Sequence, residues 1–459
     1  MYRRNLFVLS VLAIVSIVLV ACGGAAEAPA PEEPAAEEPA EEPAEEPAEE
    51  PAEEPAEEPA EEPVTIEWWH IQSDPGPHQD AWQEMADAYM AEHPNVTINI
   101  TILENEAFKS KLPTVMQAGD PPDLFQSWGG GTMNEYAKAG LLRDITADVE
   151  GEWGDSFGAG ALGVYAYEGK QYGVPWDMGM VGFWYNKDLF AEAGIDAPPE
   201  TWAELLEDVE LLKAAGITPI ALGEGEKWPG HFYWVYLATR LGGKPAFDAA
   251  YSRSGSFTDE PYVQAGSKLQ ELLELEPFQE GFMAASHNDS EALIGDGEAA
   301  MLLMGQWAPE VMRINSSSGE GIGDALGFFP FPAVEGGAGA LTDAMGGGNG
   351  ICVGANAPDE AVDFLRYLTS MENQVKLTEI GAIVPVVKGA ETAIENPNMV
   401  FVFEGVNQAE YFQLYYDQYL PPAVGEAVND SVQGIFAGTI TPEDAAQAID
   451  DAYAQELGE

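Results

Sequence analysis

The sequence predicts an α/β fold with two lobes. Three observations support this: strand and helix patterns alternate after Pro63, the alternation starts again near Thr201, and roughly 400 residues exceed what a single hydrophobic core organises. Repeated alternation of this kind predicts mostly parallel sheets, with ligands bound at the carboxyl ends of the strands.

The first segment after Pro63 has the pattern strand, helix, strand. Apolar side chains alternate over 64–68 and again over 96–102, and between them apolar residues recur at helical spacing over 82–90. A further strand over 123–126 leads into Trp128 and three glycines, which indicate a loop rather than core.

The alternation starts again in the middle of the chain. Thr201 and Glu204 have the spacing of a capping box, so they predict the start of a helix, which Gly216 ends. The remaining segments that we expect are a strand over 217–222, a buried strand over 299–304, a helix over 364–377 and a closing helix after Thr441 and Pro442.

The first 63 residues precede the folded part. Arg3 and Arg4 come before an uncharged apolar run over 6–20, which is typical of a secretory signal and too short for a membrane-spanning helix. The run ends in Leu-Val-Ala-Cys, which resembles a bacterial lipobox. The resemblance implies a signal peptide over 1–21 and a lipid on Cys22; the alternative is an ordinary signal peptide with a coincidental cysteine.

Residues 22–63 consist almost entirely of Glu, Pro and Ala in repeated tetrads. The repeat offers no large apolar side chain to bury, and a proline at every fourth position removes helical hydrogen bonds. We therefore expect a disordered, extended linker that holds the folded body away from the membrane.

The chain is strongly acidic, with a formal net charge of -61 at pH 7. Such a field repels nucleic acid and anionic lipid headgroups, so neither is an expected partner, whereas a neutral or cationic ligand fits. The alternative is that the charge serves only solubility outside the cell.

No catalytic or cofactor motif stands out in the sequence. The metalloprotease, nucleophile-elbow and phosphate-loop patterns are absent, the five histidines are scattered, and Cys352 is the only cysteine after Cys22. We therefore expect no enzyme, no metal site and no cofactor. A glycoside hydrolase is the enzymatic alternative, because it also needs aromatic faces and carboxyl groups.

Tryptophans stand beside Gly, Pro, Asp or Gln at predicted strand ends. They occur at Trp68-Trp69-His70, Trp128-Gly129-Gly130, Pro175-Trp176-Asp177, Lys227-Trp228-Pro229 and Gly305-Gln306-Trp307. Indole rings pack on the apolar C–H faces of pyranose rings, while sugar hydroxyls need carboxylate, amide or imidazole partners. The pattern favours sugar recognition, whereas Trp82 and Trp202, on amphipathic helix faces, are expected in the core.

Several longer runs point in the same direction. They are PPDLFQSWGGG at 121–131, AGLLRDI at 139–145, YGVPWDMG at 172–179, FWYNKDLFAEAGI at 183–195, TWAELL at 201–206, LKAAGITPIALG at 212–223 and GEAAMLLMGQW at 297–307. In order and together, these runs resemble the family 1 extracellular solute-binding proteins of ATP-driven sugar importers, including raffinose, xylo-oligosaccharide and maltodextrin binders.

The resemblance implies a two-lobed periplasmic-binding-protein fold with interleaved lobes, a hinge and a ligand cleft between the lobes. Lobe 1 is expected over 64–174 and 333–384, and lobe 2 over 175–332 and 385–459. By position, Asp123 matches a carboxylate that accepts hydrogen bonds from sugar hydroxyls, Trp176 and Asp177 match the ligand-facing crossing, and Trp307 matches an aromatic platform. Further candidates in loops expected to border the cleft are Trp69, His70, Trp128, Trp228, Gly347 and Asn349.

The function implied is capture of a neutral sugar or short oligosaccharide, with delivery to the membrane permease of an ABC importer. The protein is expected to be a monomer without a cofactor, at the outer face of the cytoplasmic membrane or in the periplasm, held to the membrane by its lipid anchor only. The alternatives are a lipid-tethered binder of a cationic solute and a secreted glycoside hydrolase. The sequence does not specify which sugar is bound.

Overall fold

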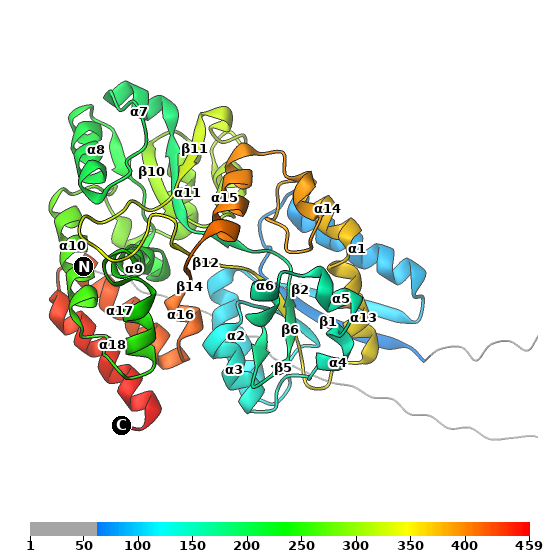
Figure 1. The fold of residues 1–459 in the computed structure, drawn as a ribbon. Helices are drawn as coiled ribbons and strands as arrows, with labels where there is room; N and C mark the ends of the chain where they lie inside the picture. Colours follow the sequence, from blue (N-terminus) through cyan, green and yellow to red (C-terminus); the bar gives the residue numbers. More distant parts are fainter. Residues whose placement is uncertain (1–61) are drawn as a thin grey trace, which may run out of the picture. The chain divides into compact units, whose positions relative to one another are not determined.

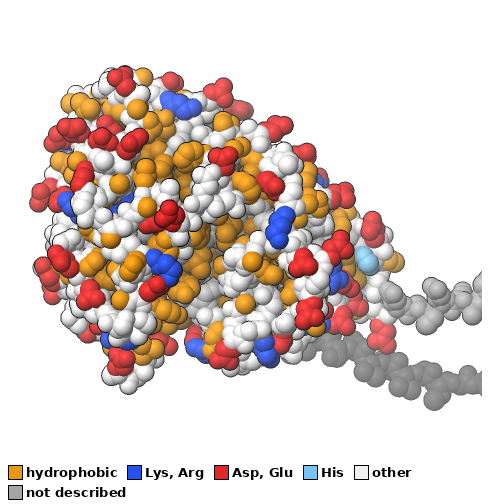
Figure 2. All heavy atoms as spheres, in the orientation of Figure 1, with side chains coloured by type: hydrophobic (Ala, Val, Ile, Leu, Met, Phe, Trp, Pro, Cys, Tyr) orange, Lys and Arg blue, Asp and Glu red, His pale blue; other side chains and the backbone are white. Residues whose placement is uncertain are grey.

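A computed structural model describes residues 62–459 (Figure 1). The predicted signal peptide, the predicted lipidation site Cys22 and the linker up to residue 61 lie outside the described residues. Among the helices of residues 62–459, none is both long enough and apolar enough to cross a membrane. Figure 2 shows Asp and Glu side chains spread over the visible face, with fewer Lys and Arg among them.

The first lobe is built on a five-stranded sheet with the order β2-β1-β3-β13-β6. Its strands are β1 (Val64–His70), β2 (Val96–Ile102), β3 (Leu124–Ser127), β6 (Gly173–Pro175) and β13 (Gly350–Val353). β1 pairs in parallel with β2 and β3, whereas β13 runs antiparallel to β3 and β6.

The two faces of this sheet bury different hydrophobic clusters, because successive side chains of a strand point to opposite sides. Trp68 belongs to the cluster that packs α1 (Pro77–Glu92) and α13 (Asp359–Leu368) on one face. Trp69 packs against the cluster beneath α2 (Asn105–Gln117) and α3 (Gly130–Lys138) on the other. Trp82 is 2% exposed, which confirms that it is a core residue.

Two expectations for this lobe are wrong in detail. The helix expected over 364–377 is two helices, α13 and α14 (Met371–Glu379), because the Ser370 side chain accepts a hydrogen bond from the amide of Asn373 and starts a new helix. The three glycines after Trp128 are not all loop, since α3 begins at Gly130. A Cβ on Gly131 would lie 2.1 Å from the carbonyl oxygen of Leu420, so glycine permits this close approach.

Short elements complete the lobe. They are α4 (Thr146–Val149), α5 (Glu152–Ser156), α6 (Ala159–Gly163), the hairpin of β4 (Ala166–Tyr167) and β5 (Lys170–Gln171), and the 3-10 turn η4 (Ala390–Ala393).

The second lobe contains two sheets. The larger has the order β11-β8-β10-β9, from β8 (Gly182–Asn186), β9 (Thr218–Ile220), β10 (Ala299–Met304) and β11 (Leu326–Phe329). The smaller has the order β14-β12-β7, from β7 (Gly179–Met180), β12 (Ala344–Gly347) and β14 (Phe412–Leu414). β10 occupies its predicted range, and all six of its residues are buried.

Helices surround these sheets. They are α7 (Lys187–Ala193), α8 (Trp202–Ala214), α9 (Trp228–Tyr251), α10 (Glu260–Glu274), α11 (His287–Gly295), α12 (Ala308–Asn315), α15 (Pro397–Gln408), α16 (Tyr416–Tyr419), α17 (Pro422–Phe436) and α18 (Pro442–Leu457), with the 3-10 turns η1 (Glu224–Glu226), η2 (Phe282–Ala284) and η3 (Gly323–Ala325). The predicted capping box is confirmed: the Thr201 hydroxyl accepts from the Glu204 amide at 3.3 Å, and the Glu204 carboxylate accepts from the Thr201 amide at 3.0 Å. Trp202 is 1% exposed, as a core residue should be.

Both large sheets are mixed, so the expectation of mostly parallel sheets is wrong. A parallel pair needs a long crossover connection between its strands. β13 enters the first sheet from β12, which belongs to another sheet, through residues 348–349, and it pairs with β3 in the antiparallel direction.

The chain passes between the two cores three times within the described residues. The links are 176–178 between β6 and β7, 348–349 between β12 and β13, and the segment after Val387 that leads to α15. The lobes are therefore interleaved in sequence. Their residue boundaries stay a prediction; β12, within the range assigned to lobe 1, pairs with β7 and β14 and buries Ala344 and Met345 in the core of the other lobe.

Candidate ligand-binding site

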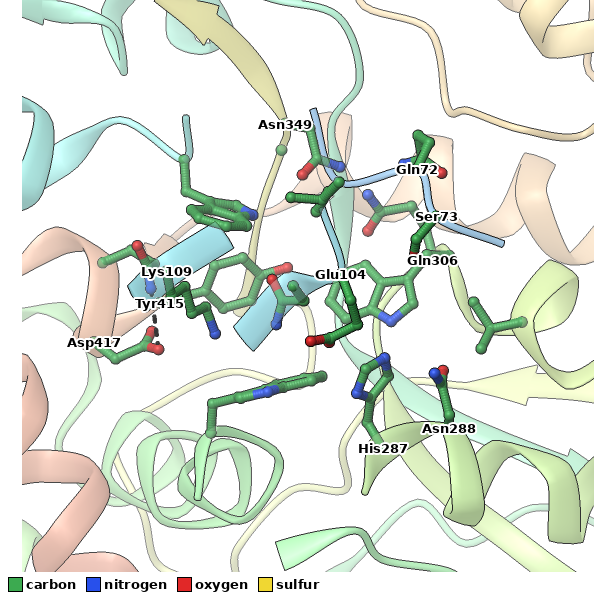
Figure 3. A pocket seen from close by; sticks show the side chains of 18 of the residues that line it. Gln72, Ser73, Glu104, Lys109, His287, Asn288, Gln306, Asn349, Tyr415 and Asp417 are labelled. Atoms are coloured by element: carbon green, nitrogen blue, oxygen red, sulfur yellow. Dashed lines mark hydrogen bonds between the residues drawn. The ribbon is translucent and has the colours of Figure 1, made fainter. Parts of the chain in front are cut away.

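A cavity of about 150 Å³ lies between the lobes, lined by residues of both (Figure 3). The first lobe contributes Ile71, Gln72, Ser73, Asp74, Glu104, Asn105, Lys109 and Trp128, and the link between β12 and β13 contributes Gly348 and Asn349. The second lobe contributes Trp228, His231, Phe232, His287, Asn288, Gln306, Trp307, Val311, Tyr415, Asp417 and Gln418. The cavity thus lies beyond the carboxyl ends of β1, β3 and β10, where α/β sheets commonly bind ligands.

The end of β10 positions Trp307. The strand stops at Met304, and the ring of Trp307 folds back over Gly305, where a Cβ would lie 2.1 Å from the indole. Glycine at this position therefore lets the ring lie across the strand end. Trp307 is half-buried, packs on the core of the second lobe, and lines the cavity.

Indole rings from the two lobes are brought together in the cavity. The ring centroids of Trp228 and Trp307 are 6.2 Å apart with an interplanar angle of 59°, and Trp128 comes from the opposite lobe. The Lys109 ammonium lies 5.7 Å from the centroid of the Trp128 ring and 5.5 Å from that of Trp228, within the range of a cation–π contact. Lys109 therefore joins the aromatic faces of both lobes.

Several residues that line the cavity carry a buried polar atom with no hydrogen-bond partner in the described residues. They are the Trp228 Nε1, both ring nitrogens of His231, the Asn288 Oδ1, the Gln306 Oε1 and the Tyr415 hydroxyl. Buried polar groups are normally paired, and an unpaired one costs about 1–3 kcal/mol. The set includes donors and acceptors, so it suits a ligand that carries several groups of both kinds.

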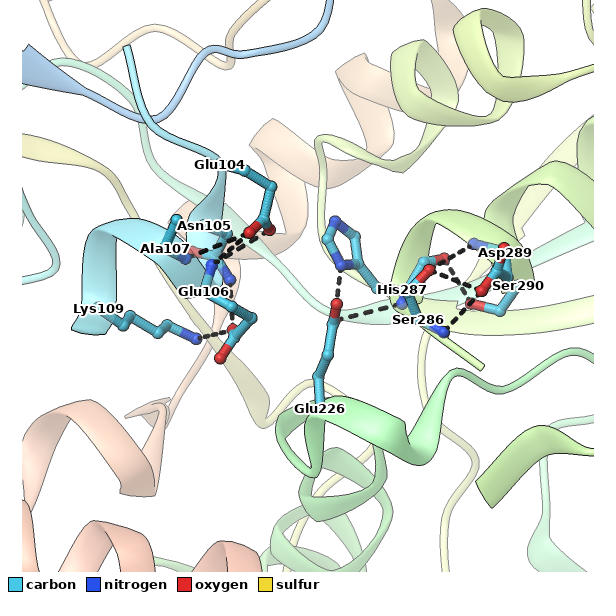
Figure 4. Close-up of polar contacts among 10 residues, drawn as sticks. All are labelled: Glu104, Asn105, Glu106, Ala107, Lys109, Glu226, Ser286, His287, Asp289 and Ser290. Carbon is cyan, nitrogen blue, oxygen red and sulfur yellow. Dashed lines mark hydrogen bonds and ion pairs between the residues drawn. The ribbon is translucent and has the colours of Figure 1, made fainter. Parts of the chain in front are cut away.

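His287 and Glu226 form a charged pair at the edge of the cavity (Figure 4). The His287 Nδ1 lies 2.7 Å from the Glu226 Oε2, and the His287 amide donates to the same oxygen at 3.2 Å. Burial acts to lower the pKa of His287, but the hydrogen bond to Glu226 and the charge of that carboxylate outweigh it and raise the pKa to about 9. His287 is therefore positively charged at neutral pH.

His231 has the opposite character. It is fully buried, and burial lowers the pKa of its imidazole despite Asp417, whose Oδ1 lies 3.7 Å from the His231 Nε2. His231 is therefore neutral at pH 7, and a neutral imidazole offers one donor and one acceptor.

Four of the residues predicted as ligand-binding line the cavity: Trp128, Trp228, Trp307 and Asn349. Asp177 lies directly behind it, 3% exposed, and accepts hydrogen bonds from the lining residues Asn349 and Gln306. Burial raises the pKa of Asp177 to about 6, against the hydrogen bonds that lower it.

The structure places the other predicted residues elsewhere. Asp123 precedes β3, at the opposite end of the strand from the cavity, and its Oδ2 accepts from the Glu67 amide at 2.9 Å. Because β1 and β3 are parallel, residues before either strand lie at the far edge of the sheet. Trp176 is 2% exposed and packs edge-on against Trp82, with ring centroids 5.2 Å apart.

His70, Trp69 and Gly347 also do not line the cavity. His70 is 4% exposed, its Nδ1 accepts from the Gln72 amide, and burial lowers its pKa to about 3. Trp69 points to the face of the sheet that α2 covers, beneath Lys111. Gly347 packs against the Tyr415 ring, and a Cβ added at Gly347 would lie 2.6 Å from that ring.

Sequence reasoning missed the polar residues at helix starts, namely Glu104, Asn105, Lys109, His287, Asn288, Tyr415, Asp417 and Gln418. One signal was available: Ser286 and Asp289 form a capping box that marks His287 as the first residue of α11. Within residues 62–459, no group of three or more His, Cys, Asp or Glu side chains is placed to hold a metal ion.

Two α/β lobes, three links and a cavity between the lobes define a two-lobed periplasmic binding protein. The chain belongs to the bacterial extracellular solute-binding protein family, whose model matches residues 75–375.

Known proteins agree with this assignment. The chain is 28% identical over 246 residues to an uncharacterized ABC transporter extracellular-binding protein of Pyrococcus horikoshii, a match that spans 52% of this chain and 54% of that relative. A solved chitin oligosaccharide binding protein is 27% identical, with a TM-score of 0.79 over 86% of this chain and all of that chain. A structure from a study of xylan utilization by the thermophilic bacterium Caldanaerobius polysaccharolyticus is 28% identical, with a TM-score of 0.78 over 84% and 99% of the two chains.

Proposed function

We propose that this protein captures a neutral sugar or short oligosaccharide outside the cytoplasm and delivers it to the permease of an ABC importer. The observation that carries the proposal is the joint presence, among the residues that line one cavity, of indole faces and buried unpaired polar atoms. Trp128, Trp228 and Trp307 offer apolar faces to the C–H groups of a pyranose ring. His231, Gln306 and Tyr415 offer hydrogen-bonding atoms to its hydroxyls.

The size of the cavity is consistent with this ligand. About 150 Å³ is the volume of the engineered cavity that holds a single benzene ring in another protein, so the cavity described here has space for about one sugar ring. A longer oligosaccharide would extend through the mouth or require the lobes to move apart about the three links.

The named relatives support the ligand class and the partner. The two solved structures come from work on chitin oligosaccharides and xylan, and the Pyrococcus relative is named as part of an ABC transporter. The alternative of a small cationic solute is less well supported by these relatives. The charged groups that line the cavity are mixed in sign, with Lys109 and His287 beside Asp74, Glu104 and Asp417, and so do not favour a cation by themselves.

We also propose that the protein does not turn its ligand over. A glycoside hydrolase needs two free carboxyl groups on either side of the scissile bond. Three carboxyl groups line the cavity. Glu104 caps α2, accepting hydrogen bonds from the amides of Glu106 and Ala107 at 3.0 and 3.2 Å, and Asp417 faces His231, which leaves Asp74 alone rather than a pair.

We further propose that the protein is held by a lipid at the outer face of the cytoplasmic membrane or in the periplasm, where its folded body acts as a monomer. The apolar run over 6–20 and the resemblance of the segment ending at Cys22 to a lipobox support export and a diacylglyceryl anchor.

Calorimetric titration of the purified protein with three ligand sets tests the proposal. The sets are neutral oligosaccharides based on glucose, xylose, galactose or N-acetylglucosamine, cationic ligands such as polyamines, and chromogenic glycosides. We expect saturable binding of a neutral sugar and no release of chromophore over many hours. Binding confined to polyamines, or chromophore release that a carboxylate mutation abolishes, would show that the proposal is wrong.

A further inference from the structure

Asp177, which lies behind the cavity, accepts four hydrogen bonds from two residues that line it. Its Oδ1 accepts from the Asn349 amide at 2.6 Å and from the Asn349 Nδ2 at 3.1 Å. Its Oδ2 accepts from the Asn349 Nδ2 and from the Gln306 Nε2, both at 3.1 Å. An ionised carboxylate only accepts, so each partner must turn an N–H toward it.

Gln306 is thereby oriented with its Nε2 toward Asp177, which turns its Oε1 away from that carboxylate. It is 2% exposed, and because its Nε2 donates to Asp177, its Oε1 is left without a protein partner. A Cβ on Gly179 would lie 2.4 Å from this amide, so the backbone of Gly179 packs closely against it. Gln306 and Asn349 both line the cavity (Figure 3).

Asn349 is oriented by the same carboxylate. Its backbone N–H and its side-chain Nδ2 both donate to Asp177. Its Oδ1 is therefore free to accept from the Gln126 Nε2 at 2.6 Å. Gln126 lies in β3 of the first lobe, and Gln306 follows β10 of the second. The hydrogen bonds therefore run from both lobes toward one buried acceptor at the links.

We propose that Asp177 is a positioning residue that decides which end of the Gln306 amide faces the cavity, so that the site presents an acceptor and requires a hydroxyl donor on the ligand. The inference rests on the proposed function, since it concerns a sugar hydroxyl, and it adds a specificity requirement to it. Asp177 acts through Gln306 and does not touch the ligand.

The substitution Asp177→Asn tests this directly. Asparagine keeps an oxygen that accepts from Asn349, but its NH2 group becomes a donor facing Gln306. The Gln306 amide then has to reverse, so that its Oε1 accepts from the asparagine and its Nε2 points into the cavity. The probes are the tightest-binding sugar from the ligand screen and its series of monodeoxyfluoro analogues, in which one hydroxyl at a time becomes a group that cannot donate.

In the unaltered protein, we expect one fluoro analogue to bind at least tenfold more weakly because its C–F group meets the Gln306 Oε1. In Asp177→Asn, the parent sugar should bind about tenfold more weakly, and the penalty at that one position should disappear. Adding Gln306→Glu should reverse the change, since the asparagine donates to one glutamate oxygen and the other again faces the cavity as an acceptor.

Asp343→Asn is the matched control, because Asp343 is also a buried aspartate, 6% exposed, but bonds to the amide of Ala340 outside the cavity. It should leave the analogue pattern unchanged. A side-chain measurement on the unaltered protein covers the case in which Asp177→Asn does not fold: on sugar binding, the ¹³Cδ resonance of Gln306 should shift while its Nε2 protons stay protected from exchange.

The outcomes separate the two proposals. If the unaltered protein binds no sugar, the proposed function fails. If it binds sugar but Asp177→Asn still binds that fluoro analogue more weakly than the parent sugar, the positioning role of Asp177 is overturned. The same holds if the double variant folds but does not recover this difference in affinity. Loss of exchange protection at the Gln306 Nε2 protons on sugar binding would also overturn it.

Discussion

The Nδ1 of His287 lies 2.7 Å from the Oε2 of Glu226, and this contact keeps a partly buried imidazole charged. The pKa of His287 is raised from 6.5 to about 9. A histidine whose pKa is higher in the folded state contributes stability that is fully present below pH 6.5 and is lost as the pH rises through about 9.

The first prediction is that the free energy of unfolding falls between pH 7 and 9.5. This pH-dependent loss should be smaller in His287→Gln. The contribution at neutral pH should be on the order of 1–3 kcal/mol, since one pKa unit corresponds to about 1.4 kcal/mol. Urea unfolding at a series of pH values measures it. Burial also raises the pKa of Glu291, to about 8, which gives a loss in the same direction, so Glu291→Gln is the necessary companion variant. An unchanged slope in His287→Gln would contradict the charged pair.

The second prediction concerns Trp307. If its ring is a platform for a sugar face, Trp307→Ala should weaken sugar binding by about 1–3 kcal/mol, which is five- to 150-fold in affinity at tenfold per 1.4 kcal/mol. The control is Trp202→Ala, a fully buried tryptophan of α8, which should cost about 3–5 kcal/mol of stability and leave binding by the folded fraction unchanged. Titration and thermal melting of both variants distinguish the two roles; unchanged affinity in Trp307→Ala would remove the platform.

The third prediction is structural. Arg240 is fully buried and donates to the carbonyl oxygens of Phe331, Pro332, Leu341 and Asp343, which holds the segment between β11 and β12 in place. Arg240→Met should destabilise the protein by at least about 3 kcal/mol, because several buried carbonyl groups lose a charged donor. Arg240→Lys should recover only part, since lysine lacks the planar fork of donors. A loss below about 1 kcal/mol in Arg240→Met, measured by urea unfolding, would exclude this role.

The fourth prediction places the anchor. Mass spectrometry of the mature protein from its native membrane should show an N-terminus at Cys22 with a diacylglyceryl group on the sulfur. Cys22→Ala should release the protein into the soluble fraction with the folded body intact. A mature N-terminus beyond Cys22, or a free thiol there, would mean an ordinary secreted protein.

The sequence predicted correctly those helices and strands whose local residue pattern matches their burial in the folded protein. β10 matches its predicted range because six consecutive apolar residues fill a fully buried strand, and α8 because Thr201 and Glu204 satisfy its first amides. Position at a strand end did not decide the role of every tryptophan. Trp128 and Trp307 follow the carboxyl ends of β3 and β10 and line the cavity, and Trp69 lies within β1. Trp176 also follows a strand, β6, but packs in the core against Trp82.

What could not be read from the sequence depends on pairing between distant segments. The direction of β13 decides that its sheet is mixed, and no local pattern encodes it. Asp123 was placed at the site by resemblance, but the parallel pairing of β3 with β1 puts it at the other edge of the sheet. His287 and Lys109 come from opposite lobes, so only the folded structure shows that they share one cavity.

The place of β13 in the first sheet has a consequence for biosynthesis. β6 pairs with β13 and with no other strand in the described residues, and β13 also covers the free edge of β3. The first lobe therefore cannot complete its five-stranded sheet until residue 353 has left the ribosome, long after the synthesis of β1, which starts at Val64. Pairing over such a sequence separation slows folding and leaves strand edges exposed.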